Sequence, residues 1–144
     1  MVAFPLCVKE VKMASGDTLI ILTPRHGEPP SSSAATFDTR NQHPVLDFDP
    51  DSTESIMFSA VMPRAYGGNG ITVYIHAALT SDTNNAHEVR WDVAWERIGD
   101  QQQDIDNDSF AAANSVSMPV PSTSGLVDIV NVTFTDGADM DKET

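Results

Sequence analysis

Aspartates grouped in short polar segments are the residues of this sequence best suited to chemistry. Closely spaced carboxylates in loops can supply the hard oxygen ligands that Ca²⁺ requires. The EF-hand pattern is not met, because a loop that begins at Asp47 has Ser52 and Phe58 at the positions that require Gly and Glu. Acidic turns closed by side-chain to backbone bonds are therefore the favoured interpretation, and we expect no metal or cofactor. The three groups are Asp47, Asp49 and Asp51; Asp104, Asp106 and Asp108; and Asp136, Asp139 and Asp141.

The remaining reactive side chains show no catalytic arrangement. The histidines at positions 26, 43, 76 and 87 contain no pair at the i, i+4 spacing of helical metal ligands. No G-x-S-x-G elbow is present. The G-G-N-G segment at 67–70 carries no lysine, so a turn is favoured over a phosphate-binding loop. Cys7 lies between Leu6 and Val8, which favours a buried thiol over a nucleophile. The sequence therefore predicts no catalytic residues and no enzyme.

The composition indicates one acidic domain. The chain has 144 residues, with 8 Lys and Arg against 21 Asp and Glu and a net charge of -13. This charge argues against a nucleic acid or an anionic membrane as partner. A single cysteine excludes an internal disulfide. Residues 1–14 have no basic region and no uninterrupted apolar run, so we expect neither a signal peptide nor a membrane span.

Short segments of alternating or β-branched residues predict strands along the chain. The clearest is 89–98, where Val89, Trp91, Val93 and Trp95 alternate with polar residues. Aromatic rows can stack on sugars, but valines on the same face favour core packing for the two tryptophans. No segment has a sustained helical period, apart from a possible turn or two at 109–114. The other predicted strands span residues 18–23, 34–39, 44–48, 71–79, 115–120 and 126–135.

The segment 54–79 has the pattern of a β-hairpin. Two apolar runs flank a turn that contains Gly67, Gly68 and Gly70, and Pro63 closes the first run. Residues 24–33 are rich in Pro and Ser and predict an irregular loop. The expected organisation is an N-terminal extended arm and loop over 1–30, followed by a domain over 31–144. The expected fold is an all-β sandwich, jelly-roll-like, because closing strands into two packed sheets limits exposed edges.

Several motifs occur in an order that resembles β-rich structural proteins of tailed bacteriophages. The first is D-F-D-P-D-S-T-E-S-I-M-F-S-A-V-M-P-R-A-Y at 47–66, which continues through G-G-N-G-I-T-V. The strand at 89–98 follows, then D-I-D-N-D-S-F at 104–110 and the segment at 125–141 that ends D-G-A-D-M-D. The resemblance covers residues 44–141. Proteins of this kind continue into further strands, whereas this sequence ends at Thr144. Either the chain is truncated or the sheet is completed by the N-terminal strand or by a neighbouring copy, and completion within an oligomer is the favoured interpretation.

The resemblance implies a virion component made in the host cytoplasm. A short acidic domain of this kind suits a head decoration (cement) protein that binds the major capsid protein as a homo-oligomer, most simply a trimer. The expected contact is the N-terminal arm. The alternative is a tail or head-fibre appendage domain that contacts host-surface glycans through exposed aromatics such as Tyr66 or Tyr74. A β-sandwich hydrolase ranks third, because the sequence offers no set of convergent polar groups.

Overall fold

The regular structure of this protein is almost entirely β. The computed structural model describes residues 16–68, 70–99, 104–107 and 110–135. Within these ranges eight strands form small antiparallel sheets, and a single 3-10 turn is the one helical element. The all-β prediction is therefore confirmed. The chain divides between Gly67 and Gly68 into two compact units, called unit 1 and unit 2 here.

Unit 1 is built from a short helix and two strand pairs. The helix η1 (Pro24–His26) begins after Thr23, and strand β1 (Gly27–Glu28) follows it directly. Strand β1 pairs with β4 (Met57–Phe58), with Gly27 opposite Phe58. Ala35 and Tyr66 are its buried apolar residues within the described range.

A tight hairpin completes unit 1. Strands β2 (Thr36–Arg40) and β3 (His43–Asp47) pair antiparallel and are joined by two residues, Asn41 and Gln42. Both of these residues have positive φ, at 45° and 68°. Positive φ at both central positions is the geometry of the two-residue turn that matches the twist of paired strands. The predicted strands at 34–39 and 44–48 are thus confirmed with small shifts of their ends.

Unit 2 contains two strand pairs that are nested in the sequence. Strand β5 (Ile71–Ala78) pairs antiparallel with β8 (Val127–Phe134). Strand β6 (Glu88–Val93) pairs antiparallel with β7 (Asn114–Pro119), and both lie between β5 and β8 in the sequence. Strands β7 and β8 also lie close together. The predicted strands at 71–79, 115–120 and 126–135 are confirmed, and the strand at 89–98 is shorter than predicted because it ends at Val93.

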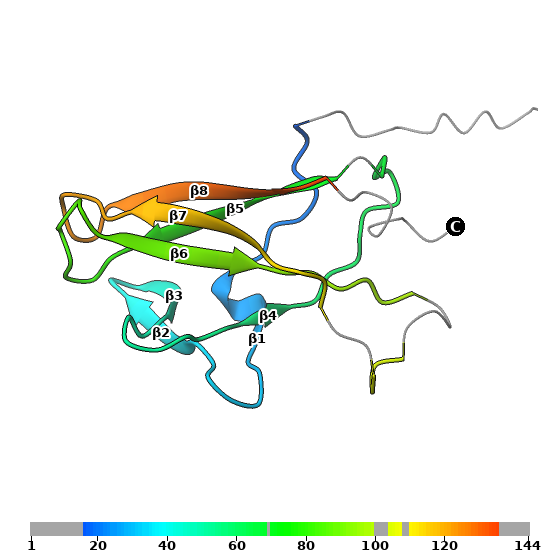
Figure 1. The fold of residues 1–144 in the computed structure, drawn as a ribbon, viewed down its shortest axis with the longest axis horizontal. Helices are drawn as coiled ribbons and strands as arrows, with labels where there is room; N and C mark the ends of the chain where they lie inside the picture. The colour runs from blue at the N-terminus through cyan, green and yellow to red at the C-terminus, as the bar shows by residue number, and fades with distance from the viewer. Residues whose placement is uncertain (1–15, 69, 100–103, 108–109, 136–144) are drawn as a thin grey trace, which may run out of the picture. The chain divides into compact units, whose positions relative to one another are not determined.

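The two pairs of unit 2 are consecutive parts of one long antiparallel ribbon. Between them, the Val120 N–H donates to the His87 carbonyl and the Gly125 N–H to the Leu79 carbonyl, each at 3.0 Å. Figure 1 shows the two loops that connect the pairs, 79–87 and 120–126, at the same end of the strands. One strand of this ribbon is formed by β5 and then β6, and the other by β7 and then β8; at the two loops the ribbon folds back, so that β6 runs opposite to β5 (Figure 1).

The alternation predicted for these strands is present in the burial of their side chains. In β6, Val89, Trp91 and Val93 are half-buried while Arg90 and Asp92 are exposed. The most buried side chains of unit 2 lie on or beside β7 and β8, and each contributes roughly 1.5–3 kcal/mol by leaving water. They are Met118, Val120, Val132 and Phe134.

The hairpin predicted over 54–79 is wrong. Its first run contributes only β4, which pairs with β1, and its second run forms β5, which pairs with β8. The glycine-rich segment separates the two units instead of joining paired strands. Strand β5 instead has eight consecutive partners on β8, whereas the first run contributes only two paired residues, to β1.

The N-terminal predictions also need correction. Residues 18–23 form no strand and leave Ile20, Ile21 and Leu22 exposed. The loop predicted over 24–33 contains η1 and β1, because Pro24 suits the first position of a helix. Residues 1–15, which hold half of the predicted arm and loop and also Cys7, lie outside the described residues. No helix in the described part of the chain has the length and apolar character needed to cross a membrane.

Candidate functional site

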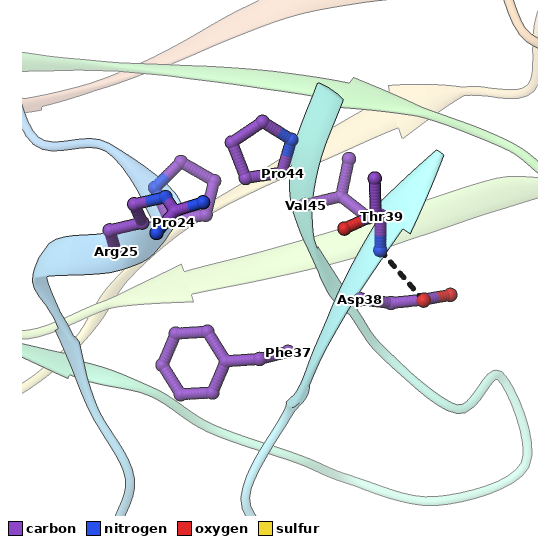
Figure 2. Close-up of a pocket in the computed structure, with 7 residues that line it drawn as sticks. All are labelled: Pro24, Arg25, Phe37, Asp38, Thr39, Pro44 and Val45. Atoms are coloured by element: carbon purple, nitrogen blue, oxygen red, sulfur yellow. Dashed lines mark hydrogen bonds between the residues drawn. The ribbon is translucent and has the colours of Figure 1, made fainter. Parts of the chain in front are cut away.

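A hollow of about 320 Å³ lies in unit 1 between η1 and the β2–β3 hairpin. Figure 2 shows Phe37 and Asp38 on opposite sides of β2, as successive residues of a strand must be. The Asp38 carboxylate accepts a 2.7 Å hydrogen bond from the Thr39 N–H. The lining residues are Pro24, Arg25, Phe37, Asp38, Thr39, Pro44 and Val45.

The lining of this hollow includes an aromatic ring and a cation. Phe37 keeps 48% of its surface exposed and offers a ring face. Arg25 is exposed and has no ion-pair partner among the described residues. The lining contains no Cys, His or Ser, and the Asp38 carboxylate in it accepts the hydrogen bond from the Thr39 N–H. The arrangement can hold a small group that stacks on an aromatic ring beside a cation.

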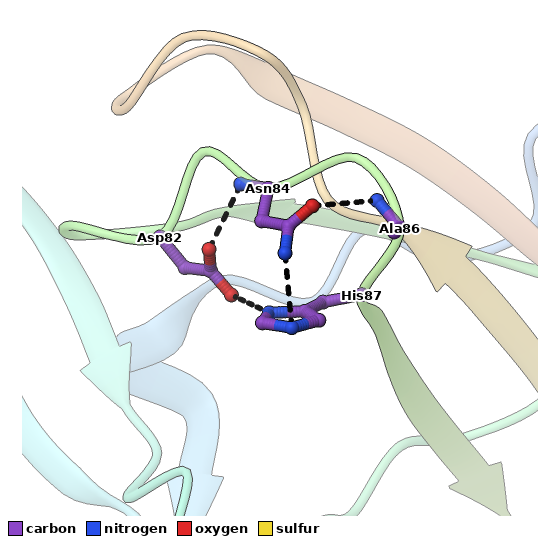
Figure 3. A network of polar contacts seen from close by, with 4 residues as sticks. All are labelled: Asp82, Asn84, Ala86 and His87. Carbon is purple, nitrogen blue, oxygen red and sulfur yellow. Dashed lines mark hydrogen bonds and ion pairs between the residues drawn. The ribbon is translucent and has the colours of Figure 1, made fainter.

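The loop between β5 and β6 contains a histidine held from both sides of its ring (Figure 3). Nδ1 of His87 lies 2.8 Å from Oδ2 of Asp82, and Nε2 lies 3.1 Å from Nδ2 of Asn84. The Asn84 N–H donates to Oδ1 of Asp82 at 2.9 Å, and Oδ1 of Asn84 accepts the Ala86 N–H at 3.1 Å. The loop is closed by its own side chains.

This network resembles a catalytic dyad only in its residue types. Both ring nitrogens of His87 are engaged, so neither is directed at a substrate. The Asn84 N–H, together with His87, lowers the pKa of Asp82, which keeps that carboxyl ionised. A bonded Asp-His pair without a nucleophile at the second nitrogen fixes the loop and does not activate a hydroxyl.

The aspartate groups show the turn geometry expected of acidic loops. Oδ1 of Asp49 accepts the Asp51 N–H at 2.9 Å, and Oε2 of Glu54 accepts the Asp49 N–H at 2.8 Å. Asp104 accepts bonds from the side chain of Asn107 and from the N–H of Asp106, and both lower its pKa.

The described part of these groups forms no metal-binding cluster. Within that part of the chain, no three His, Cys, Asp or Glu side chains come together as a metal ion would need. Asp108 and the third group, Asp136, Asp139 and Asp141, lie outside the described residues.

The two tyrosines considered for glycan contact differ in burial. Tyr66 is 4% exposed, so its place among the exposed aromatics was wrong. Tyr74 is 64% exposed on β5 and remains available. Trp91 and Trp95 are both half-buried, which agrees with core packing rather than with a stacking platform.

A polar group links β6 to β7 on their exposed face. Nε of Arg90 donates to Oδ1 of Asp92 at 2.8 Å, and the same guanidinium donates to Oγ of Ser115 at 3.0 Å. The Ser115 hydroxyl donates to Oδ1 of Asp92. The bond from Ser115 and then that from Arg90 lower the pKa of Asp92. Since Asp92 and Ser115 are register partners, this group reports on correct pairing of the strands.

Sequence reasoning missed the hollow and the histidine loop for different reasons. The hollow depends on η1, whose signal was the Thr23-Pro24 dipeptide at the start of an apparent linker. The loop had a readable signal as well, because Asp82 and Asn84 are the residues that form local side-chain to backbone turns. Their relation to His87 required the turn itself to be seen.

Comparison of this chain with protein-family models, with curated proteins and with solved structures gives no match in any of the three.

Proposed function

We propose that this chain is a structural protein of a tailed-phage virion, a capsid decoration (cement) protein that binds the head shell and stabilises it. The observation that carries the proposal is the number of large apolar side chains that the described strands and loops leave in water. Six apolar residues are buried in the described range, whereas fourteen large apolar residues are exposed. Exposed apolar surface of this extent is typical of proteins that complete their burial against partners.

A jelly-roll-like sandwich is the fold that we propose for unit 2 together with the strands that complete its sheets. The nested pairing of β5 with β8 around β6 with β7 supports it, because a jelly roll forms when one long ribbon folds so that successive pairs enter opposite sheets. The buried side chains on β7 and β8 would then form the layer between the sheets. The order of sequence motifs shared with phage structural proteins supports the same fold.

The proposed contact with the major capsid protein is the N-terminal region. Its described part contains three successive apolar residues, Ile20, Ile21 and Leu22, which are 37%, 74% and 46% exposed. Their burial at junctions between capsid subunits would stabilise the assembled shell by mass action, since free subunits lack that junction. The proposed assembly is a homo-oligomer, with a trimer as the simplest form on such a lattice.

The test uses heads assembled without the protein. Purified full chain is added, the shells are imaged by electron microscopy, and the temperature at which they open is measured. We expect ordered density on the head lattice and an opening temperature that rises to saturation with added protein. Ile21→Asp should reduce occupancy, and Thr18→Asp, which adds the same charge at an exposed position nearby, should not. Binding to tails alone, or none at all, would refute the proposal.

A tail or head-fibre domain that binds glycans is the second candidate. It is favoured by Tyr74 on the outer face of β5 and by Phe37 at the hollow of unit 1, since exposed aromatic rings stack on sugars. A glycan array would show binding that Tyr74→Ala or Phe37→Ala removes. Ser117→Ala changes another exposed position and serves as the control.

A further inference from the structure

We propose that strand β5 pairs with β5 of a second copy across a two-fold axis, so that two ribbons join into one continuous sheet. This inference concerns the purified protein and goes beyond the proposed function. If the protein does not dimerise through β5, the proposed decoration of the shell is not refuted. If it does not bind the shell, the proposed dimer is not refuted.

The outer edge of β5 carries backbone N–H and C=O groups that have no strand partner in the described part of the chain. Among the described strands, β5 pairs only with β8. The opposite edge of the same sheet is partly used, because β7 lies beside β8 and Nδ2 of Asn114 donates to the Thr133 carbonyl at 3.0 Å. Unpaired N–H and C=O groups along an extended strand form a template for another strand.

Strand β5 lacks the features that protect edges from pairing. Natural edge strands carry Lys, Pro, inward charges or bulges, or are very short. Its eight residues, I-T-V-Y-I-H-A-A, include no Lys, no Pro and no carboxylate. All eight pair with β8 in unbroken register, so no bulge interrupts the strand. An unprotected edge of this length is a pairing site.

Charge identifies a second copy as the occupant. The chain carries a net charge of -13, so two copies repel wherever their carboxylates meet. The outer face of the β5–β8 sheet is exposed and has no Asp, Glu, Lys or Arg, which makes it a region of least repulsion. A basic partner would instead choose a surface that supplies carboxylates. The residues of this face are Thr72, Tyr74, His76, Val127, Ile129, Asn131 and Thr133.

The sequence of β5 is compatible with antiparallel pairing to itself. With Ile75 opposite Ile75 of the second copy, Tyr74 faces His76 and Val73 faces Ala77, so each larger residue meets a smaller or planar one. In this register the apolar side chains of both copies lie on the same face of the joined sheet. The contact is isologous and gives a dimer, which differs from the trimer expected for the decoration protein unless a second contact enlarges the assembly.

The test measures the mass of the full-length protein by sedimentation over a range of concentrations. We expect a dimer of twice 15.6 kDa. Tyr74→Glu should raise the dissociation constant by at least about tenfold, because it places two carboxylates diagonally across the new pair. Ser117→Glu, on the exposed face of β7, should change it by less than about threefold.

One further variant distinguishes pairing at the edge from packing of the faces. Ile129→Glu lies on the same face but one strand away from the edge, so edge pairing predicts a smaller effect than that of Tyr74→Glu. Equal effects would indicate face-to-face packing and overturn the proposal, as would a monomer at every concentration.

Oxidation gives a direct readout of register in a Cys7→Ser background. Tyr74→Cys combined with His76→Cys should form a covalent dimer, because opposite Cβ atoms lie about 4.5–5.5 Å apart. Thr72→Cys combined with Tyr74→Cys should not. A covalent dimer from the second pair, or none from the first, contradicts the register.

Discussion

Two glycines at the start of unit 2 differ in what their backbone requires. Gly70 has φ of 86°, and a Cβ at this position would clash with the Phe134 carbonyl oxygen. Gly68 has φ of 75°, but a Cβ there would meet no atom within 4 Å. Gly70 therefore allows the close approach of the two chain segments at the end of the β5–β8 pair, whereas Gly68 satisfies only a turn.

We expect Gly70→Ala to destabilise unit 2 by roughly 2–4 kcal/mol, since the strained φ and the clash act together. Gly68→Ala should cost only about 1 kcal/mol, the price of the positive φ alone. Urea unfolding monitored by tryptophan fluorescence measures both, because Trp91 and Trp95 lie in this unit. Similar losses for the two variants would contradict the assigned role of Gly70.

At the scale of residues, burial was predictable from the sequence inside strands with a period of two and was not predictable outside them. The alternation in β6 and β7 correctly separated half-buried from exposed side chains. The burial of Tyr66 was missed because it follows a strand end and carries no periodic signal. The turn at Asn41 and Gln42 was also missed, since it achieves positive φ without glycine.

At the scale of elements, strand positions were predictable and strand partners were not. A period of two is a local property that a short segment displays by itself. Pairing depends on segments far apart, and β5 lies about fifty residues from its partner β8 along the chain. The glycine-rich turn favoured a local hairpin, but the longer, fully registered pairing with β8 replaced it. The hollow could not be predicted for the same reason, because its lining comes from two separate segments, η1 and the β2–β3 hairpin.

The polar group of Arg90, Asp92 and Ser115 makes the β6–β7 pair sensitive to pH. Hydrogen bonds to the ionised carboxylate lower the pKa of Asp92 below its ordinary value of 3.8. Such a group contributes stability above its unfolded pKa and loses that contribution as the pH falls through the folded pKa. Ser115→Ala removes the first of these bonds, so we expect the pKa of Asp92 to rise toward 3.8 and the protein to lose stability near neutral pH.

A carboxyl titration by NMR and unfolding at about pH 7 and about pH 2.5 test this prediction. The stability difference between wild type and Ser115→Ala should shrink at the lower pH, because protonation of Asp92 removes the charge that the Ser115 hydroxyl stabilises. Ser117→Ala, on the same exposed face of β7, should leave the pKa of Asp92 unchanged. An equal loss of stability at both pH values would show that Ser115 acts through packing instead.

At the scale of the whole molecule, charge bears on the proposed contact between copies of the chain. An excess of carboxylates makes two molecules repel each other in dilute buffer, so the proposed contact lies on an uncharged strand surface. The composition alone predicted the repulsion. It could not place the uncharged surface, because Tyr74 and Ile129 become neighbours on one face only through the pairing of β5 with β8.

Salt should therefore strengthen association between copies. The screening length falls from about 30 Å at 0.01 M to about 8 Å at 0.15 M salt, which removes most of the repulsion between molecules of net charge -13. We expect the dissociation constant of the β5-paired dimer to fall by at least about threefold over that range, measured by sedimentation equilibrium. The Tyr74→Glu variant should show a steeper dependence, because its two added carboxylates lie diagonally across the contact and repel each other. Dissociation by salt would instead indicate that opposite charges hold the copies together, and would place the contact on the acidic surface.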